Sequence, residues 1–460
     1  MRNILVIGAG FSGTLMAARL LMHATGHPLR VYLLNGSGRI ARGMAYGTQS
    51  ARHVLNVPAG NMSAFDDDPD HFVRFAQGIN PAIKGSTFVS RRVYGDYLEW
   101  ILNEAERKAP VGIELLRVYQ KVESIQSCQL NDSWEILLES GEVLHGEKII
   151  LALGHFSSSR PKISIMKFYE SRRYLHDPWD SSRIDAIPAK ASVLLLGTGL
   201  TAVDVAMTLM DRNPNRRITA LSRRGLLPQG HRQTANIPLE STLKSIWGDC
   251  VTVRTQLRAF RQHCDVLREQ GRDWREALAV LRHETAGIWQ SYSYFERKRF
   301  SRHVQPFWDT HRHRLAPDIA ERFYNAHKSG VIQTFAGRLS KLEEIGDTIE
   351  AALSPRGRDE TQVIQAQYVI NCTGPCADPR QADSALVQRL LIAGMIRPDA
   401  LGLGIDVSAD CSVITANGRP STNLFYIGPW LKSTYWEATA VPDLRAIAAK
   451  LTKRILVDVI

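Results

Sequence analysis

Short apolar runs, each followed by a glycine-rich turn and then by apolar residues at helical spacing, organise this chain. The first run lies at 3–7 and is followed by a helical pattern over about 12–24 and a second apolar run at 29–34. The same order of strand, turn, helix and strand returns at 191–222. Such a succession forms a βαβ unit, so the hydrophobic pattern predicts an α/β fold with two parallel sheets.

Different patterns fill the space between these two units. The segment 40–80 is rich in Gly, Asn, Pro and Asp and is expected to be a loop. Residues 91–108 return to helical spacing, and a hairpin-like stretch at 119–144 precedes the apolar run 149–154. A Ser-rich segment with prolines at 157–190 is expected to link the first unit to the second.

The second half of the chain is first helical and then returns to strands. Helical periodicity dominates 240–328, where tryptophans are interspersed with arginines. Strands resume at 331–370, and the chain closes with a strand at 424–428 and a helix from about residue 436.

The first glycine turn, Gly8-Ala-Gly-Phe-Ser-Gly13, has the spacing of a dinucleotide-binding loop. Gly8 permits the sharp turn, Gly10 lets the backbone approach a pyrophosphate, and Gly13 allows helix and strand to pack closely. Free N–H groups at the start of the helix attract the phosphates. We therefore expect the first dinucleotide to contact Gly8, Gly10, Phe11, Ser12 and Gly13, although a merely tight βα turn is the alternative.

The residue at the end of the second strand differs from the usual pattern. An acidic side chain normally accepts hydrogen bonds from the ribose hydroxyls at this point. This chain has Asn35 there, and an amide oxygen can accept the same bonds without a charge. Asn35 is therefore expected to contact the ribose.

The second glycine turn spans 197–202 and has Ala202 in place of the third glycine, which is an accepted variant. Its partner strand ends in Ser222-Arg-Arg224, where an enzyme that uses NADH would present a carboxylate. Guanidinium groups suit a 2′-phosphate, which favours NADPH over NADH. The alternative is that both arginines are surface charges. The expected cofactor contacts are Gly197, Gly199, Thr201, Arg223 and Arg224.

Three further strands end in glycine. The runs 149–154 and 369–374 are expected to be the crossings by which the chain leaves an interrupted first domain and returns to it, with plain core strands as the alternative. Gly428 ends a strand before the last helix. The cofactor contacts expected from these strand ends are Gly154, Thr373, Gly374 and Gly428.

Two dinucleotide loops in one chain indicate a flavoprotein that is reduced by a nicotinamide. The predicted fold class is α/β, with two Rossmann-like dinucleotide-binding domains, one for FAD and one for NADPH, and a helical insertion. The FAD domain is expected at 1–165 and 341–460. The NADPH domain is expected at 166–340, with the insertion at about 240–328.

Composition limits the class of protein. The 460 residues are 44% hydrophobic and 22% charged, as in an ordinary globular protein. No run approaches the length of a membrane span, and the first strand leaves no room for a signal peptide, so neither a membrane nor a secretory segment is expected. The six cysteines have no framework spacing, which favours the reducing cytoplasm.

The net charge of +11 is concentrated in 211–330. Nucleic-acid binding is one interpretation of such a bias. A solvated helical face with a pocket for phosphate or carboxylate is the favoured one, because no nucleic-acid-binding module is visible. No nucleic-acid partner is therefore expected.

Two other clusters suggest different chemistry. Cys372 and Cys376 could form the dithiol of a disulfide reductase, but their spacing is not Cys-x-x-Cys. His311 and His313, with His303 nearby, imitate a metal site without carboxylates or cysteines at ligand spacing. Neither a thiol relay nor a bound metal is expected.

Several blocks of this sequence resemble the bacterial YdhS-like FAD/NAD(P)-binding proteins, which are related to flavin-dependent N-hydroxylating monooxygenases. The blocks run from end to end of the chain and leave only 230–330 poorly matched. They are Gly8-Ala-Gly-Phe-Ser-Gly13, Gly43-Met-Ala-Tyr46, His53-Val-Leu-Asn-Val-Pro58, Met62-Ser-Ala-Phe-Asp-Asp-Asp-Pro69, Arg91-Arg-Val-Tyr-Gly95, Gly197-Thr-Gly-Leu-Thr-Ala-Val-Asp204, Ser222-Arg-Arg-Gly-Leu-Leu-Pro228, Asn371-Cys-Thr-Gly-Pro375 and Tyr435-Trp-Glu-Ala-Thr-Ala-Val-Pro442.

The resemblance implies that NADPH reduces FAD, that O₂ adds to the reduced flavin, and that the flavin hydroperoxide hydroxylates a small polar metabolite at an amine nitrogen. It also implies a cation near the FAD phosphates at Arg42. The loop at 53–65 is expected along the flavin ring, where Asn56, Asn61 and Ser63 are the catalytic candidates; a loop held by its own hydrogen bonds is the equal alternative. Tyr94 and Tyr97 are expected to be core residues.

Substrate recognition is the least determined part. Arg297, Arg299 and Arg302 are the candidates for holding an anionic substrate group, because they lie in the basic helical segment. Alternative functions are another NAD(P)H-dependent flavin oxidoreductase or ring hydroxylase, or a slow-turnover flavin-bound redox sensor or partner protein. Related flavoproteins commonly self-associate, so a homo-oligomer is possible.

Overall fold

The computed structural model describes residues 1–36, 39–48, 50, 52–128, 133–232, 242–358 and 360–457, and these residues form two compact units. The first unit comprises Met1–Phe156, His283–Tyr292 and Ala377–Ile460. The second comprises Ser157–Arg282 and Ser293–Cys376. Each unit contains a sheet with a parallel part that includes a βαβ unit, which confirms the predicted α/β class with two Rossmann-like domains.

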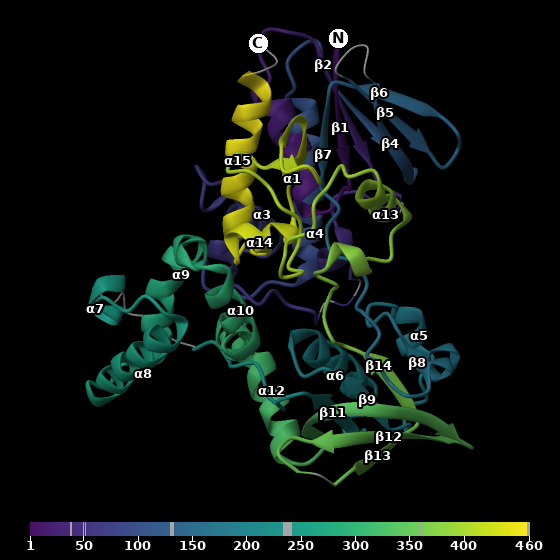
Figure 1. Ribbon diagram of the computed structural model, residues 1–460, viewed down its shortest axis with the longest axis vertical. Helices are drawn as coiled ribbons and strands as arrows, with labels where there is room; N and C mark the ends of the chain where they lie inside the picture. The colour runs from purple at the N-terminus through teal and green to yellow at the C-terminus, as the bar shows by residue number, and fades with distance from the viewer. Residues whose placement is uncertain are drawn as a thin grey trace. The chain divides into compact units, whose positions relative to one another are not determined.

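The first unit is built on a six-stranded sheet of order β15-β16-β7-β1-β2-β3, of which β7, β1 and β2 are labelled in Figure 1. All neighbours are parallel except β15 and β16. The central strands are buried along nearly their whole length, as expected for a sheet covered on both faces. The strands are β1 (Arg2–Ile7), β2 (Leu29–Leu34), β3 (Ile113–Val118), β7 (Lys148–Leu151), β15 (Ser412–Ile414) and β16 (Pro420–Tyr426).

Helices and a small antiparallel sheet complete this unit. Helix α1 (Phe11–His23) packs against α4 (Arg91–Arg107) and against α15 (Val441–Val457). Helix α13 (Ala385–Ile392) contacts the small sheet of order β4-β5-β6. The remaining elements are α2 (Gly43–Tyr46), η1 (Ala59–Asn61), α3 (His71–Ile79), β4 (Val122–Cys128), β5 (Ser133–Leu138), β6 (Val143–Gly146), η3 (Pro379–Gln381), η4 (Pro429–Leu431) and α14 (Lys432–Tyr435).

The second unit is built on a seven-stranded sheet of order β13-β12-β11-β10-β9-β14-β8. The strands from β8 to β11 in this order are parallel, and β11, β12 and β13 form an antiparallel meander. They are β8 (Tyr174–Leu175), β9 (Val193–Leu196), β10 (Ile218–Ser222), β11 (Ile332–Ile345), β12 (Thr348–Pro355), β13 (Gln362–Ala366) and β14 (Tyr368–Asn371). Short elements η2 (Met166–Glu170) and α5 (Ser181–Asp185) precede β9, and α6 (Leu200–Arg212) follows it.

The return to the first unit comes later than the sequence suggests. The second unit extends to Cys376, not to 340, because β11 to β14 continue its sheet beyond β10. The first crossing also falls slightly earlier than 165, after Phe156. Residues 341–376 therefore belong with the second glycine loop and not with the first.

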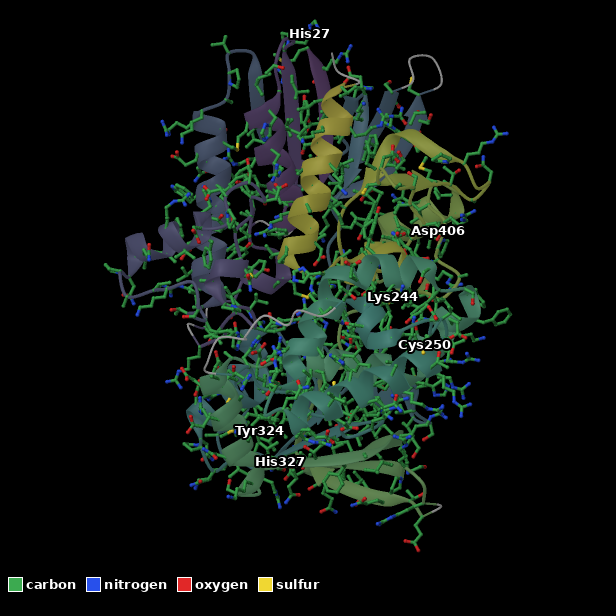
Figure 2. The ribbon with its side chains drawn as sticks, turned by 90° about the vertical axis from the view of Figure 1, so that its left-hand side faces the viewer. His27, Lys244, Cys250, Tyr324, His327 and Asp406 are labelled. Carbon is green, nitrogen blue, oxygen red and sulfur yellow. The ribbon has the colours of Figure 1, made fainter. Side chains whose placement is uncertain are left out.

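Helices follow β10, where the sequence predicts helical periodicity. They are α7 (Leu243–Trp247), α8 (Val253–Glu269), α9 (Trp274–Ser291), α10 (Tyr294–His303), α11 (Gln305–Arg312) and α12 (Pro317–Lys328). Tyr324 on α12, labelled in Figure 2, donates a 2.5 Å hydrogen bond to the carbonyl of Pro228. Residues 240 and 241 of the expected segment, and 129–132 in the expected hairpin, lie outside the described residues.

Helix α9 contributes to both units. Its last residues belong to the first unit, where Trp289 donates its indole N–H to the carbonyl of Ser433 at 2.8 Å. The rings of Trp289 and Trp436 pack with centroids 4.6 Å apart. In the part of the chain that the structure covers, none of the helices has the length and apolar character that crossing a membrane requires.

Candidate dinucleotide-binding sites

The first glycine loop joins β1 to α1 and leaves no space for a side chain at two of its glycines. Gly8 has φ of +102°, and a Cβ there would lie 2.2 Å from the carbonyl oxygen of Ala152. A Cβ at Gly13 would lie 1.8 Å from the carbonyl oxygen of Gly8. Since real side chains cannot occupy such positions, both glycines are required by the loop itself.

The start of α1 offers backbone donors. Gly10 is the N-cap residue and makes no side-chain capping bond, and the first N–H groups of a helix have no intrahelical acceptor. The Phe11 and Ser12 side chains are buried, and the Phe11 ring stacks on Tyr94 with centroids 6.4 Å apart. Phe11 and Ser12 are therefore placed to meet a phosphate through their amides and not through their side chains.

A cleft of about 470 Å³ lies beside this loop at the carboxyl ends of β1 and β2. It is lined by Gly8 and Asn35, two of the expected cofactor contacts, and also by Lys121, Glu139 and Ser384. The amide N–H of the Asn35 side chain donates to the carbonyl of Arg39 at 2.7 Å, and its contact with the ribose stays a prediction. The residues that the sequence did not indicate come from distant elements and follow no motif.

Gly154 and Gly428 complete the edge that carries the first loop. They follow β7 and β16, which pair in parallel with each other, and β7 pairs in parallel with β1. Their φ values are +70° and +151°, and no atom lies within 4 Å of a Cβ built on Gly154. The structure thus brings Gly8, Gly154 and Gly428 to one edge of one sheet.

The guanidinium of Arg42 is not the free cation that was expected near the FAD phosphates. Its side chain is 7% exposed, and its Nε donates to Glu99 at 2.6 Å while Nη2 contacts Asp96. The hydrogen bond to Glu99 is the main cause that holds the pKa of the Arg42 guanidinium above its ordinary value, despite burial. Since two carboxylates of α4 already neutralise this charge, the expected phosphate contact is not supported, and Arg42 instead anchors the segment that follows β2.

The three catalytic candidates of the 53–65 loop have different surroundings. Ser63 is fully buried, and its hydroxyl donates to the carbonyl of Phe65 at 3.0 Å and accepts from the Phe65 N–H at 3.1 Å. This is the self-bonded loop that was the alternative to catalysis. Asn56 is half-buried and Asn61 is exposed at the end of η1, and their catalytic role stays a prediction.

Tyr94 and Tyr97 on α4 have no exposed surface, as expected of core residues. The Tyr97 hydroxyl accepts from the Ala64 N–H at 3.2 Å, and the Nδ1 of His71 lies 2.7 Å from the same oxygen. Through the hydrogen bond from Ala64, Tyr97 therefore fixes the 53–65 loop to α4.

The second glycine loop repeats the geometry of the first. Gly197 has φ of +121°, and a Cβ there would lie 2.3 Å from the carbonyl oxygen of Cys372. Gly199 is the N-cap of α6, and no atom lies within 4 Å of a Cβ built on it. Thr201 lies in the first turn of this helix and is half-buried. Backbone donors of α6 are thus accessible to a phosphate.

Thr373 and Gly374 lie beside this second loop and not in the first unit. They follow β14, which pairs in parallel with β9. The Thr373 hydroxyl donates to the side-chain oxygen of Asn371 at 2.7 Å, whereas Gly374 has φ of +89° with open space around its Cα. Within this unit, Thr373 and Gly374 would therefore contact the second dinucleotide and not the first.

The arginines after β10 gather into a cationic group. Arg224 is anchored, because its Nη2 donates to the carbonyl of Arg302 at 2.7 Å and its guanidinium lies 5.6 Å from the Phe307 ring centroid. Burial, followed by the positive charges of Arg356 and Arg223, lowers the pKa of Arg224. Arg223 and Arg356 are both exposed.

Arg356 was not indicated by the sequence. It follows β12, and its N–H donates to the carbonyl of Ala336 at 3.3 Å. Ala336 is the partner of Ser222 in the pairing of β11 with β10. Only this register, which no local motif encodes, brings Arg356 to the end of β10 beside Arg223 and Arg224.

The three substrate candidates on α10 do not converge. Arg297 lies two and five positions from the other two and points to another side of a helix with 3.6 residues per turn, whereas Arg299 and Arg302, three positions apart, share one face. Arg299 pairs with Glu296 on the same helix, Arg302 is exposed, and Arg297 is half-buried. Their role in substrate binding stays a prediction.

Thiol and metal chemistry find no support in the described residues. Cys372 and Cys376 are buried and unbridged, and burial raises the pKa of the Cys372 thiol well above its ordinary value. A protonated buried thiol is a poor nucleophile. In the ranges that the structure describes, no group of three or more His, Cys, Asp or Glu side chains is arranged to hold a metal ion.

Comparison with known sequences identifies partial relatives. A family model described as FAD-NAD(P)-binding matches residues 5–156. The nitrosuccinic acid synthase of Aspergillus oryzae is 25% identical over 177 residues, which cover 33% of this chain and 26% of that protein. The match thus spans about a quarter of the length of this curated relative.

Solved structures are similar over the whole chain. The ornithine N-hydroxylase of Kutzneria sp. 744 has a TM-score of 0.63 at 15% identity and covers 99% of both chains. The cadaverine monooxygenase of Erwinia amylovora has a TM-score of 0.65 at 14% identity and covers 98% of this chain and 94% of that one. At these identities the likeness establishes the fold alone.

Proposed function

We propose that this chain is an FAD- and NADPH-dependent monooxygenase that hydroxylates a small polar metabolite at an amine nitrogen. The observation that carries the proposal is the pair of dinucleotide loops, one in each unit, within a fold that ornithine and cadaverine hydroxylases share over nearly the full length of both chains. The partial match to nitrosuccinic acid synthase supports the same chemistry at nitrogen.

The residues of the first unit fit FAD. Gly8 and Gly13 are required by the close packing of the loop, and Gly10, without a side chain, would let the backbone approach a pyrophosphate that the first turn of α1 would hold. Asn35 lines the adjoining cleft where a ribose would lie. Gly154 and Gly428 end neighbouring strands at the same edge. Bound FAD would supply the activation of oxygen, which no amino acid side chain provides.

The residues of the second unit fit NADPH. Gly197, with its tight contact to Cys372, and Gly199, which is open, would let the start of α6 hold the pyrophosphate. Arg223 and Arg356 would meet the 2′-phosphate, and Arg224 would support them from its fixed position. If these arginines are only surface charges, removing one of them will leave the affinity for NADPH unchanged.

The side chains and backbone of this protein would position the reactants and would not themselves react. The two glycine loops fix each dinucleotide at the carboxyl end of a parallel sheet, where ligands of this fold class bind. The buried Ser63 and Tyr97 hold the 53–65 loop, on which Asn56 and Asn61 remain the candidates for contacting the flavin ring. Precise placement of the reactants accounts for much of the rate in such catalysis.

We infer from the blocks quoted above that the chain belongs to the YdhS-like group. The FAD-NAD(P)-binding family model matches residues 5–156, which contain five of these nine blocks. We also infer a reducing compartment, since all six cysteines are free. Self-association stays a prediction.

The experiment uses the purified holoenzyme. Anaerobic NADPH should bleach the flavin absorbance, and air should restore it. A panel of amines and amino acids is then screened for faster NADPH and O₂ consumption, with mass detection of one added oxygen that derives from ¹⁸O₂. If NADPH failed to reduce the bound flavin, the monooxygenase hypothesis and every other hypothesis of an NAD(P)H-dependent enzyme would be refuted.

The product distinguishes the remaining alternatives. A hydroxylamine or a more oxidised nitrogen group supports the proposal, whereas a new C–O bond identifies a ring or carbon hydroxylase. Flavin reduction that no compound of the panel accelerates would instead favour the redox sensor.

A further inference from the structure

The strand order of the first unit indicates where the two halves of FAD would lie. Asn35 follows β2 and lines the cleft expected to hold the ribose of the adenosine half. In the sheet, β7 and β16 lie on the other side of β1 from β2. A pyrophosphate held by the loop after β1 would therefore leave the flavin half over the carboxyl ends of β7 and β16. The residues that follow Gly154 and Gly428 are then the ones that flank the flavin.

The segments after these two glycines meet each other. The rings of Phe156 and Trp430 stack with centroids 4.6 Å apart and an interplanar angle of 19°. Burial, followed by the positive charge of Lys432, lowers the pKa of His155 to about 4, although its ring keeps an exposed surface. His155 is therefore uncharged at neutral pH. Lys432, four residues after Gly428, brings a positive charge to this edge of the sheet.

Lys432 is held by an aromatic ring and not by a carboxylate. Its Nζ lies 4.2 Å from the ring centroid of Trp436, which is buried. Among the residues that the structure describes, Lys432 forms no ion pair with an acidic side chain. A cation placed over a ring face keeps its full charge. The ammonium can therefore still stabilise an anion that binds nearby.

Trp436, which supports this lysine, has a strained backbone. Its φ of +59° and ψ of −57° form a rare type of γ-turn, in which the N–H of Glu437 donates to the carbonyl of Tyr435 at 2.6 Å. A positive φ is unfavourable for a bulky side chain. Such strain persists only where the surrounding structure holds it, and it concentrates at ligand sites. The turn therefore indicates a role beyond packing.

Hydrogen bonds on two sides hold this turn. The buried Ser433 hydroxyl donates to the carbonyl of Ile405 at 2.8 Å. The Ser433 carbonyl accepts the indole N–H of Trp289 at 2.8 Å, and the Trp289 ring packs on Trp436. The helix α14, which Lys432 begins, is thus fixed between a loop and the end of α9.

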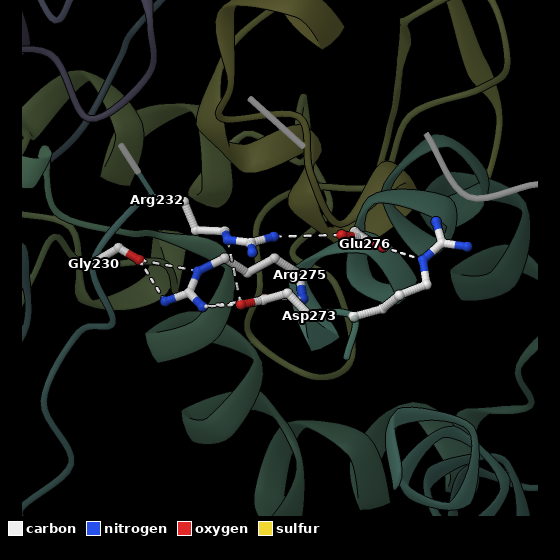
Figure 3. A network of polar contacts seen from close by, with 6 residues as sticks. Gly230, Arg232, Asp273, Arg275 and Glu276 are labelled. Carbon is white, nitrogen blue, oxygen red and sulfur yellow. Dashed lines mark hydrogen bonds and ion pairs between the residues drawn. The ribbon is translucent and has the colours of Figure 1, made fainter. Parts of the chain in front are cut away.

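The start of α9 is itself anchored by the polar network that Figure 3 shows. Glu276, whose side chain is 1% exposed, accepts from Arg272 at 2.7 Å and from Arg232 at 3.4 Å. Arg275 donates from Nη2 to the carbonyl of Gly230 at 2.8 Å. Breaking a buried ion pair is costly, because one charge is left without its partner. The helix therefore gives a firm support to the indole at its other end.

We propose that the ammonium of Lys432 faces the flavin half of bound FAD and stabilises the negative charge that reduction places on the flavin. NADPH would give up one C–H bond of its nicotinamide as a hydride, which forms an N–H bond on the flavin. The hydride carries two electrons and one proton, so NADP⁺ and an anionic reduced flavin result. A nearby positive charge favours this anion over the neutral oxidised ring. The inference rests on the proposed function, which it deepens by naming the residue that tunes the flavin.

The first experiment measures the flavin reduction potential without NADPH. The holoenzyme is reduced with dithionite beside a reference dye. Lys432→Met should lower the potential by about 30–60 mV, the equivalent of a tenfold to hundredfold change for two electrons. Lys432→Arg, which restores the charge, should retain most of the potential. Lys453→Met is the matched control, because Lys453 is exposed on α15 of the same unit.

Sulfite gives an independent measurement, because it adds to oxidised flavin, leaves a negative charge on the ring and bleaches its absorbance. Lys432→Met should weaken sulfite binding about tenfold to a hundredfold, and Lys432→Arg should bind nearly as tightly as the wild type. Should Lys432→Met fail to fold by circular dichroism, Lys432→Gln replaces it. An unchanged potential with unchanged sulfite binding would overturn the proposal, as would a purified protein that does not bind FAD.

Two other anions could be the partner of Lys432, and the same variant distinguishes them. If Lys432→Met weakened FAD binding but left the potential and the sulfite affinity of the bound flavin unchanged, the lysine would contact the pyrophosphate and the proposal would be wrong. It would also be wrong if the variant raised only the KM for a substrate of the screened panel.

The outcome remains separable from the proposed function. A potential and a sulfite affinity that depend on Lys432, in a protein whose flavin NADPH cannot reduce, would preserve the assignment and refute the monooxygenase. In an active enzyme, Lys432→Met should slow anaerobic flavin reduction by NADPH and leave the Kd for NADP⁺ nearly unchanged. An active enzyme whose flavin potential does not depend on Lys432 would refute this inference alone.

Discussion

Replacing Arg356 with glutamine tests whether the cationic group after β10 selects NADPH. Arg356 is exposed, and its charge lowers the pKa of Arg224 more than the charge of Arg223 does, although burial is the main cause. Arg224 is fixed by the Arg302 carbonyl and the Phe307 ring. The glutamine variant therefore removes one charge from the group without releasing its anchored member.

The size of the effect follows from exposure. Two unit charges 4 Å apart interact by about 1 kcal/mol in water and about 4 kcal/mol at the effective dielectric constant of a protein surface. The 2′-phosphate carries about −1.5 to −2 charges near neutral pH. Because Arg356 is exposed, the lower end applies, and we expect a loss of about 1–2 kcal/mol. This corresponds to about a 5- to 30-fold weaker interaction with NADPH.

The assay compares two cofactors and two variants. KM for NADPH and the Kd for NADP⁺ should rise about 5- to 30-fold in Arg356→Gln, while the values for NADH and NAD⁺ stay unchanged. Arg358→Gln is the matched control, because Arg358 is exposed two residues further along the same turn. The effect on NADPH should also shrink as salt is added. An equal change for both cofactors, or none for either, would refute the assignment of the 2′-phosphate to this group.

Three further outcomes test other parts of the structure. Gly13→Ala should destabilise the first unit by about 3 kcal/mol in urea unfolding and release FAD, because its Cβ would overlap the Gly8 carbonyl; Gly78→Ala, on an open face of α3, should do neither. Arg42→Gln should cost about 1.5–3 kcal/mol of unfolding free energy by removing its bonds to Asp96 and Glu99, yet FAD release that exceeds this loss would restore its phosphate role. Cys372 should resist iodoacetamide at pH 8 in the native protein, since burial raises its thiol pKa, and rapid labelling seen by mass spectrometry would reopen the thiol relay.

The parts of the sites that could be predicted are those that local sterics decide. Gly8 and Gly197 are glycines because their φ is positive and the carbonyl of the residue that follows a neighbouring strand lies where a Cβ would be. Gly154 and Gly428 likewise end strands at positive φ. These steric requirements involve only a few consecutive residues, so the spacing of the glycines after an apolar run is sufficient to identify the two loops.

The parts that could not be predicted depend on distant partners. Arg42 looks like a free cation until α4 brings Asp96 and Glu99 to it. Arg356 becomes part of the cationic group only through the register of β10 with β11. The boundary at 340 failed for the same reason, because nothing local in β11 distinguishes a strand that extends the second sheet from one that returns to the first.

Each glycine loop packs against the carbonyl of a residue that follows another strand, much later in the chain. This dependence sets an order in which the two units can fold during synthesis. Gly8 packs against Ala152, and β7 then needs β16 at its other edge, which is made only after the whole second unit. The sheet of the second unit is complete once β14 has emerged, so it can form while the first sheet still lacks two strands. The first dinucleotide site is therefore the last to be finished, and Gly428, near the end of the chain, completes its edge.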